Sequence, residues 1–169
     1  MPSPINIVTR AEWMARPPVT IRPLTTPVDT VLLMYTGSAD YLTTKEVLSI
    51  LPEMQRTSIL LQSCFDINYN WLVDYNGNIY EGRGWRTNVE KYHYSPYGQF
   101  NGKSIDIGMI GNFAEKNPPR FMEKVVTRLI RWGMKEKAII KTRHLKIYNW
   151  KDFPIHHHHP NSYTHYKTF

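Results

Sequence analysis

The sequence predicts a mixed α/β domain in which helices pack on a central sheet. Three kinds of observation lead to this fold class. There are two strongly apolar runs typical of buried strands, a segment that alternates apolar and polar residues around Asn76-Gly77, and two segments with helical spacing of apolar residues. The chain has 169 residues, of which 41% are hydrophobic, so we expect one domain over residues 1–169.

The first third of the chain predicts an irregular segment, a strand and a helix. The N-terminal segment is rich in proline, and we expect it to follow the surface with Trp13 as an anchor. Residues 28–36 are predicted to form a buried strand. The sequence TTKE is a capping-box pattern, in which the Thr43 hydroxyl accepts from the Glu46 N–H and Glu46 reaches back. The helix that follows is expected to kink at Pro52.

The clearest local signal lies between Ile67 and Trp85. Two alternating runs flank Asn76-Gly77, a pair that suits the type I′ turn of a β-hairpin. Gly108 and Gly111 lie in a later apolar run, where they would allow a neighbouring group to approach closely. The remaining elements are predicted as a strand over 104–113, a helix over about 119–137 and a short last strand over 138–145.

The charge of the chain favours anionic partners. The formal net charge is +7 and the sequence pI is about 9.5, which suits acidic glycans, bacterial wall fragments, membrane surfaces or nucleic acid. The basic residues are scattered along the sequence and often stand beside acidic ones, with no long basic run and no RNP or zinc-finger pattern. We therefore expect no binding to nucleic acid.

Other classes of protein are disfavoured by what the sequence lacks. It has no apolar run long enough to span a membrane and no signal-peptide pattern, so the chain as given is expected to be soluble. Cys64 is the only cysteine, so an internal disulfide is impossible, and we expect this residue to be a small buried hydrophobe. A single cysteine does not reveal the compartment.

Several ordered motifs resemble the peptidoglycan recognition proteins, a family related to zinc-dependent N-acetylmuramoyl-L-alanine amidases. The family pattern D-I-G-Y-N-F-L-V, a turn and Y-E-G-R-G-W is similar to DINYNWLVDYNGNIYEGRGW here. The runs IVTRAEWMARPP, VLLMYTG, SIDIGMIGNF and TRHL resemble further family motifs in the same order. The resemblance implies an amidase-like fold with a central, mostly parallel sheet flanked by helices and an L-shaped groove on one face.

The resemblance also implies that catalysis has been lost. Family amidases bind zinc through the first His of H-H-T, the His of G-H-R and a Cys eight residues later. Here the matching positions hold Met34, His144 and Asp152, with Tyr35 at the second His of H-H-T. A thioether is a poor zinc ligand, and an open catalytic site needs three donors. We predict no enzyme activity, no metal and no cofactor, although a zinc amidase with rebuilt ligands, for example from His156–His159, stays an alternative.

Further residues match the family's catalytic and ligand-binding positions. Tyr69 matches a catalytic-site tyrosine that would be a remnant without metal. Arg83, Trp85 and Arg86 match groove residues, where cations would pair with peptide carboxylates and an indole would stack on sugar or apolar faces. The alternative is that Trp85 belongs to the core and that Arg83 pairs with an internal acid such as Glu81.

The segment 86–103 is longer than its family counterpart, which forms a groove wall. Its aromatic residues, including Tyr92, Tyr94 and Tyr97, would either fill the groove or present a surface for another protein. The resemblance is therefore strongest to noncatalytic receptor ectodomains of insects.

The leading functional hypothesis is a co-receptor in innate immunity. It would respond to bacterial peptidoglycan fragments (muropeptides) by pairing with another recognition domain, as an extracellular ectodomain of a plasma-membrane receptor whose membrane segment is outside this chain. A soluble sensor or decoy that binds muropeptide directly is the closest alternative. A basic scaffold for nucleic acid or lipid would instead bind any polyanion in a salt-dependent way.

Overall fold

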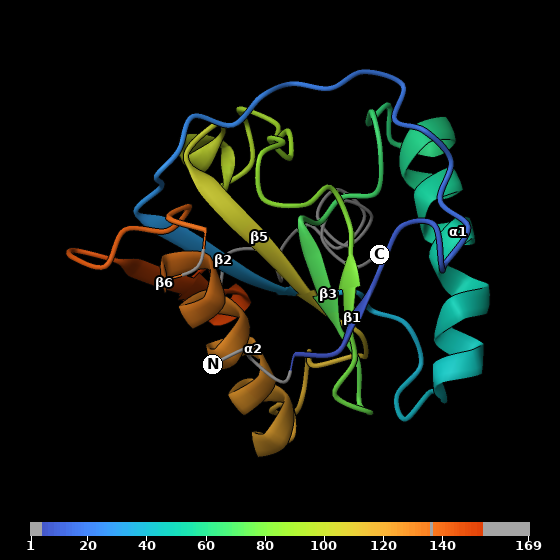
Figure 1. Cartoon of the computed structure of the whole chain (residues 1–169). Helices are drawn as coiled ribbons and strands as arrows, with labels where there is room; N and C mark the ends of the chain where they lie inside the picture. Colours follow the sequence, from blue (N-terminus) through green and yellow to red (C-terminus); the bar gives the residue numbers. More distant parts are fainter. Residues whose placement is uncertain (1–4, 136, 154–169) are drawn as a thin grey trace.

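The computed structural model describes residues 5–135 and 137–153. Its elements form one six-stranded sheet with a long helix on each side (Figure 1), which confirms the predicted α/β fold class. In chain order they are β1 (Ile7–Val8), β2 (Thr30–Tyr35), α1 (Thr44–Leu61), β3 (Trp71–Val73), β4 (Ile79–Glu81), the 3₁₀ turn η1 (Gly98–Phe100), β5 (Ser104–Met109), α2 (Arg120–Lys135), β6 (Lys146–Asn149) and the 3₁₀ turn η2 (Trp150–Asp152).

The sheet is mostly parallel, as the sequence resemblance implies. Its strand order is β1-β4-β3-β5-β2-β6, and only the β3–β4 pair is antiparallel. Strands β2 and β5 pair along their whole lengths, from Thr30 opposite Ser104 to Tyr35 opposite Met109. These two central strands build most of the sheet's middle.

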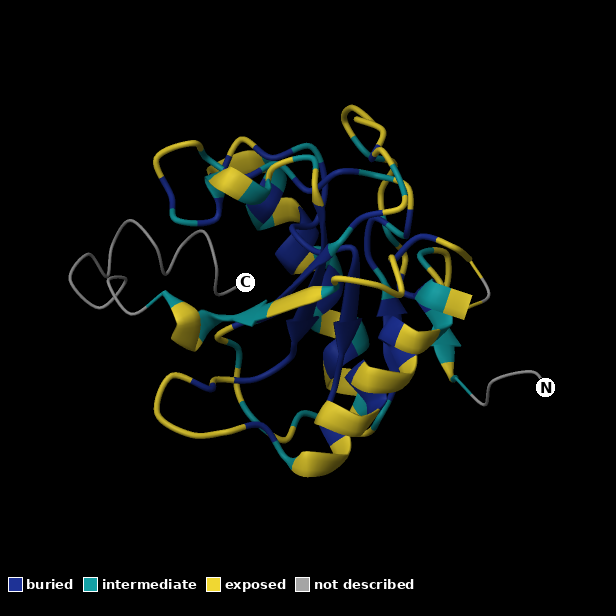
Figure 2. Cartoon of the chain, turned by 90° about the vertical axis from the view of Figure 1, so that its left-hand side faces the viewer, coloured by how far each residue is buried: buried dark blue, intermediate teal, exposed yellow. Residues whose placement is uncertain are grey.

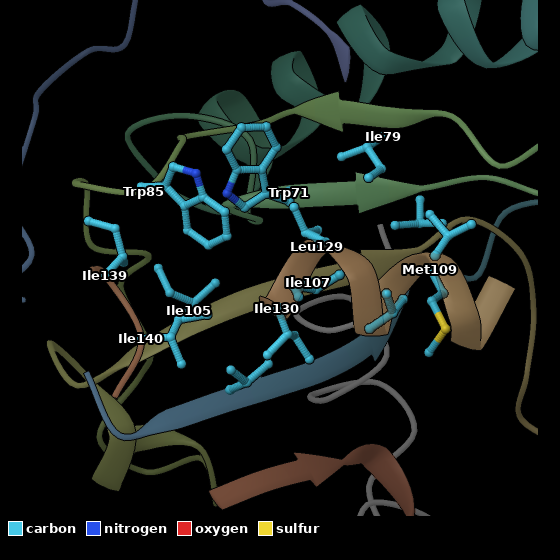
Figure 3. Packing of buried hydrophobic residues seen from close by; sticks show 14 of the residues in the cluster. Trp71, Ile79, Trp85, Ile105, Ile107, Met109, Leu129, Ile130, Ile139 and Ile140 are labelled. Atoms are coloured by element: carbon cyan, nitrogen blue, oxygen red, sulfur yellow. The ribbon is translucent and has the colours of Figure 1, made fainter. Parts of the chain in front are cut away.

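The side of the sheet that faces α2 is an apolar core. Alternate residues of β5, Ile105 and Ile107 among them, point toward α2 and pack against Leu129 and Ile130 (Figure 3). Gly133 lets the helix approach this core closely, because a Cβ there would lie 2.7 Å from Cη2 of Trp85. Burial of such large side chains contributes about 1.5–3 kcal/mol each.

The other side of the sheet is covered by α1. The predicted capping box is confirmed: the Glu46 N–H donates to Thr43 Oγ1 at 3.2 Å, and the Thr43 N–H donates to Glu46 Oε1 at 3.0 Å. The helix continues through Pro52 as one element, and its buried residues include Val47 and Leu51. We name this side the groove face, since the candidate site lies here.

The predicted hairpin is present, but its predicted turn type is wrong. A type I′ turn needs positive φ at both central residues, and only Gly77 has it, at 81°. Asp74 organises a five-residue loop instead, because its Oδ1 accepts from the N–H groups of Asn76 and Asn78 at 2.9 Å. A side chain that bonds to the backbone has replaced the tight turn.

The predicted last strand is also displaced. Residues 138–145 contribute only an isolated bridge from Ile140 to Val28, and the regular strand β6 begins at Lys146. Ala138 and His144 have positive φ, at 51° and 60°, which is incompatible with a continuous strand. The buried apolar run around Ile139 therefore belongs to the core beneath α2, and β6 pairs with β2.

The N-terminal segment is anchored as predicted. Trp13 is 1% exposed, and its Nε1–H donates to the Glu81 carbonyl at 2.8 Å. Cys64 is buried, which agrees with the expectation of a small hydrophobe. Over the ranges that the structure describes, neither helix combines the length and apolar character needed to cross a membrane.

Candidate functional site

The floor of the candidate site is the groove face of the central strands. Met34 of β2 points to this side, and Gly108 of β5 is its partner in the strand register. The Tyr69 ring lies directly over Gly108, since a Cβ there would lie 2.7 Å from Cδ1 of Tyr69. The expectation that Gly108 allows a close approach is therefore confirmed, and the approaching group is the predicted catalytic-site tyrosine.

The segment 86–103 is fixed to this floor by a buried ion pair. The Lys91 ammonium lies 3.1 Å from Asp106 Oδ2, and both side chains are almost inaccessible, at 0% and 3% exposure. Lys91 also donates to the Val89 carbonyl at 2.7 Å, while Asp106 Oδ1 accepts from the Ser104 hydroxyl at 2.7 Å. A buried ion pair needs such additional hydrogen bonds to offset its desolvation.

A second set of polar contacts holds the two ends of the segment together. The Asn88 side chain donates to Asn101 Oδ1 at 3.0 Å and accepts from the Gly102 N–H at 3.0 Å. At its start, the Asn88 N–H donates to the Arg22 carbonyl at 2.8 Å. The segment is thus closed on itself and tied to the N-terminal segment.

Tyr97 packs on the floor of the candidate site. This residue of the segment 86–103 is 1% exposed and belongs to the same buried cluster as Met34 and Tyr69. Its ring packs on Phe153, with 4.8 Å between centroids. Burial raises the pKa of the Tyr97 hydroxyl, and the nearby Tyr35, Asp106 and Asp152 add to the effect.

Arg83 and Trp85 lie inside the structure. The Arg83 guanidinium, with its side chain 1% exposed, pairs with Glu90 at 2.6 Å rather than with Glu81. Its other donors bind the carbonyls of Asp66, Ile67 and Asn88. Trp85 is 8% exposed on the α2 side of the sheet, where its ring lies 5.0 Å from Trp71 and 5.6 Å from Trp132. The structure therefore has the alternative arrangement, in which Trp85 belongs to the core and Arg83 pairs with an internal acid. That acid is Glu90 and not Glu81.

The remaining aromatic and basic candidates lie nearer the surface. Tyr94 is 63% exposed, and its ring stacks on Tyr92 at 5.2 Å with the planes 6° apart. The Tyr92 hydroxyl donates to the Gln62 carbonyl, so this ring is held in place at the end of α1. Arg86 is exposed. The Tyr94 ring, stacked on Tyr92, is therefore an accessible aromatic surface of the segment.

The residues that the resemblance matches to zinc positions belong to separate parts of the structure: Met34 to β2, Asp152 to η2, and His144 to the loop before β6. β6 pairs with β2 from Lys146 opposite Thr30 to Asn149 opposite Leu33, so His144 lies beyond the start of this pairing, while Met34 lies beyond its end. His144 also has positive φ, at 60°, so it does not continue β6 as a regular strand.

Asp152 has a local structural role instead. It is exposed, and its Oδ2 accepts from the Asn149 N–H at 2.7 Å as part of a capping box on η2. In residues 5–135 and 137–153 there is no group of three or more His, Cys, Asp or Glu side chains able to hold a metal ion. The His156–His159 run lies outside the described residues.

A separate hollow lies on the opposite side of the sheet. It is a pocket of about 220 Å³ between α2, β6 and η2, with Val126, Ile130 and Trp150 among its lining residues. None of the candidate residues predicted from the sequence lines it. The pocket and the groove face are therefore two distinct surfaces.

Sequence reasoning missed the Lys91–Asp106 pair. Asp106 stands in the middle of an apolar strand, and a charged residue at such a position usually signals a buried partner. The partner, Lys91, lies fifteen residues earlier in the chain, in the segment 86–103. No local sequence pattern identifies it.

Comparisons with known proteins agree with this fold. A family model described as N-acetylmuramoyl-L-alanine amidase matches residues 24–167. Peptidoglycan-recognition protein SD of Drosophila melanogaster is 30% identical over 141 residues, which cover 81% of this chain and 72% of that protein.

Solved structures extend the comparison. Peptidoglycan recognition protein-LE in complex with tracheal cytotoxin, a monomeric diaminopimelic acid-type peptidoglycan, is 30% identical with a TM-score of 0.74, covering 85% of this chain and 81% of that one. The ectodomain of the Drosophila transmembrane receptor PGRP-LCa is 26% identical with a TM-score of 0.74, covering 84% and 83%. These matches define an amidase-like α/β fold. The chain belongs to the peptidoglycan recognition protein family.

Proposed function

We propose that this domain is a noncatalytic co-receptor for bacterial muropeptides that acts by pairing with another peptidoglycan recognition domain. The observation that carries the proposal is the burial of Tyr97 in one cluster with Met34 and Tyr69. In that position the segment 86–103 occupies the face on which a family member would hold a ligand. The domain then contributes a surface to a complex rather than a pocket of its own.

The loss of hydrolysis in this proposal rests on chemistry at the zinc positions. Met34 offers only a thioether, and Asp152 is engaged with the Asn149 backbone. Hydrolysis needs a bound and activated water, which Tyr69 alone cannot supply. Zinc titration after metal-free purification is expected to give no stoichiometric binding, and one tight zinc per chain would revive the amidase alternative.

The proposed docking surface lies on the segment 86–103. Tyr94 is exposed and stacked on Tyr92, whose hydroxyl is held by the end of α1. Rigid tyrosines give amphipathic contact area at low entropic cost. Arg86 is exposed nearby in sequence and adds a cation for the carboxylates of a muropeptide held by the partner. The proposal includes an extracellular setting, as the ectodomain of a membrane receptor.

A sensor or decoy that binds muropeptide directly is the second candidate. The structure of a relative in complex with tracheal cytotoxin favours it, because that relative is 30% identical to this chain. The two candidates differ in whether the isolated domain binds ligand, which makes them separable by one titration.

The test is calorimetric titration of the isolated domain with a defined monomeric muropeptide, repeated with a binding-competent relative present. We expect no heat from the domain alone and a ligand-dependent heat when the relative is added. A Tyr94→Ser variant should weaken that second signal at least fivefold, while the control Tyr41→Ser, at another exposed tyrosine, should leave it unchanged. Direct micromolar binding by the isolated domain would overturn co-reception in favour of the sensor.

A further inference from the structure

The positive charge of this protein is concentrated in one stretch of the chain. Residues 120–146 contain nine Lys and Arg and two acidic residues, a net charge of +7. The whole chain also has a net charge of +7, so the remaining residues balance to zero. The net positive charge of the chain therefore lies in the helix α2, the loop after it and the first residue of β6, although basic residues also occur elsewhere in the sequence.

Helical geometry aligns the cations of α2 into one line. Their spacing of three to four residues keeps them within an arc of about 80° on the outer side of the helix, over a length of roughly 22 Å. All of them are exposed, and Figure 2 shows this outer side of α2 turned to solvent. We call this set the basic stripe: Arg120, Lys124, Arg128, Arg131 and Lys135.

The stripe is not neutralised by ion pairs with the described part of the chain. The ion pairs found there involve other cations, and none joins a stripe residue to an acid. Glu123 is the acidic residue in the first turn of α2, and it lies to one side of the stripe, where it lines the pocket between α2 and β6. Exposed cations of the following loop and of the start of β6 continue the charge beyond the helix: Lys137, Lys141, Arg143 and Lys146.

A line of cations suits a linear polyanion. Successive stripe residues lie about 4.5–6 Å apart along the helix axis. Three of the five are arginines, whose planar guanidinium groups bind phosphate oxygens in bidentate fashion. A chain of phosphodiesters presents such anions in a row, and binding releases its condensed counterions.

Other polyanions fit this surface less well. Single-stranded nucleic acid is held by aromatic rings between the cations, and the large exposed apolar side chain of α2 is Phe121 alone, at the first turn. Attachment to a bilayer uses several apolar side chains that enter the interface. The basic stripe is a row of cations without several exposed aromatic or apolar side chains beside them.

We propose that the basic stripe binds a linear polyphosphodiester of the bacterial wall, such as a glycerol-phosphate polymer. The choice of a wall polymer rests on the proposed function, since muropeptides come from the same wall. The stripe lies on the outer side of α2, and the groove face lies across the sheet (Figures 1 and 2). Both surfaces can therefore be occupied at once, and attachment to the polymer raises the local concentration of wall fragments.

The test compares two variants of equal net charge. The stripe variant carries Lys124→Gln, Arg128→Gln and Arg131→Gln. The control variant carries Arg16→Gln, Lys45→Gln and Arg56→Gln, three exposed cations on the α1 side. Thermal unfolding verifies that both remain folded. The probe is a synthetic glycerol-phosphate oligomer of defined length, titrated at several salt concentrations, with single-stranded DNA of matched charge and phosphatidylserine vesicles in parallel.

We expect the stripe variant to bind the oligomer at least tenfold more weakly at low salt, with the slope of log K against log salt reduced by roughly 2. The control variant should lose less than twofold. The inference is overturned by no binding to the oligomer, by equal losses in both variants, or by DNA or vesicles that bind more tightly through the stripe. The muropeptide titration is run on the same preparation, so that failure of co-reception with oligomer binding intact would be seen separately.

Discussion

The two sides of the sheet are built by different physical means. The side facing α2 is closed by apolar side chains, with Trp71 and Trp85 in contact with each other and with the helix (Figure 3). The groove face is closed by a segment that is fixed through a buried ion pair, Lys91–Asp106, and a buried tyrosine, Tyr97. The packing of the α2 side depends on the hydrophobic pattern and on side-chain volume. The packing of the groove face depends on specific partners, such as Lys91 and Asp106.

This difference determines how each side responds to mutation. Apolar cores accept many changes that conserve volume, whereas a buried charge that loses its partner leaves an uncompensated group in a low-dielectric interior. The groove face should therefore be the more sensitive side to single polar substitutions.

The largest expected effect follows from breaking the buried ion pair. Lys91→Met leaves Asp106 buried without its counter-charge and should destabilise the protein by about 3–5 kcal/mol. Urea unfolding at neutral pH measures the change. Adding Asp106→Asn should recover part of the loss, since the second change removes the unpaired charge.

The matched control on the other side of the sheet is Lys124→Met, at an exposed residue of α2. This variant should change stability by less than about 0.5 kcal/mol. Similar losses in the two single variants would contradict the comparison.

A second prediction removes one large ring from each side. Tyr97→Ala and Trp85→Ala each delete a buried ring and should each cost about 3 kcal/mol. Only Tyr97→Ala uncovers the groove face, so only this variant should give measurable heat with monomeric muropeptide in the absence of a partner. Heat from both variants, or from Trp85→Ala alone, would show that the segment 86–103 does not cover the ligand face.

The sequence predicted those parts of the fold that depend on local signals. The capping box at Thr43 needs residues only three apart, and the hairpin between β3 and β4 needs two alternating runs. The turn was missed because Asp74 bonds to the backbone of its own loop. The last strand was misplaced because the apolar residues near Ile140 are buried by α2 and form only an isolated bridge, with Val28, in place of a regular strand.

The candidate site was harder to predict because it is assembled from distant segments. The resemblance supplied Met34, Tyr69 and the extra length of the segment 86–103, but the register of β6 against β2, which leaves His144 before the strand, is a property of the whole sheet. The basic stripe was missed because its cations are three to four residues apart, so the sequence places other residues between them.

A third prediction concerns the hydrogen bond between Tyr80 and Asp74 on the groove face at high pH. The Tyr80 hydroxyl donates to Asp74 Oδ2 at 2.6 Å, and burial together with this carboxylate raises the pKa of Tyr80 above 10.0. Tyr80→Phe removes a hydrogen bond to a charged group and should cost about 1.5–3 kcal/mol at neutral pH. Because the folded-state pKa is raised, this stabilisation is fully present below pH 10 and is lost as the pH rises further. Unfolding free energies measured from pH 8 upward should converge for the two proteins above pH 10. Tyr94→Phe, at an exposed position, is the control and should show no such convergence.

The smallest expected effect concerns the N-terminal cap of α1, the helix that covers the groove face. The Thr43 side chain and backbone exchange hydrogen bonds with Glu46 at the surface, at 3.2 and 3.0 Å, so Thr43→Ala should cost about 1 kcal/mol through the loss of one capping partner. Thr43→Ser keeps the hydroxyl and should remain within a few tenths of a kcal/mol of the parent.

The hydrogen bonds of Glu46 lower its pKa. The stability that this carboxylate contributes is therefore present above its unfolded-state pKa and is lost as the pH falls through the lower, folded-state value. The difference between the Ala variant and the parent should shrink in acid, whereas the cost of Trp85→Ala on the apolar side should not change with pH. A Thr43→Ala cost that is constant down to pH 2 would show that the Thr43 hydroxyl contributes to stability independently of the Glu46 carboxylate.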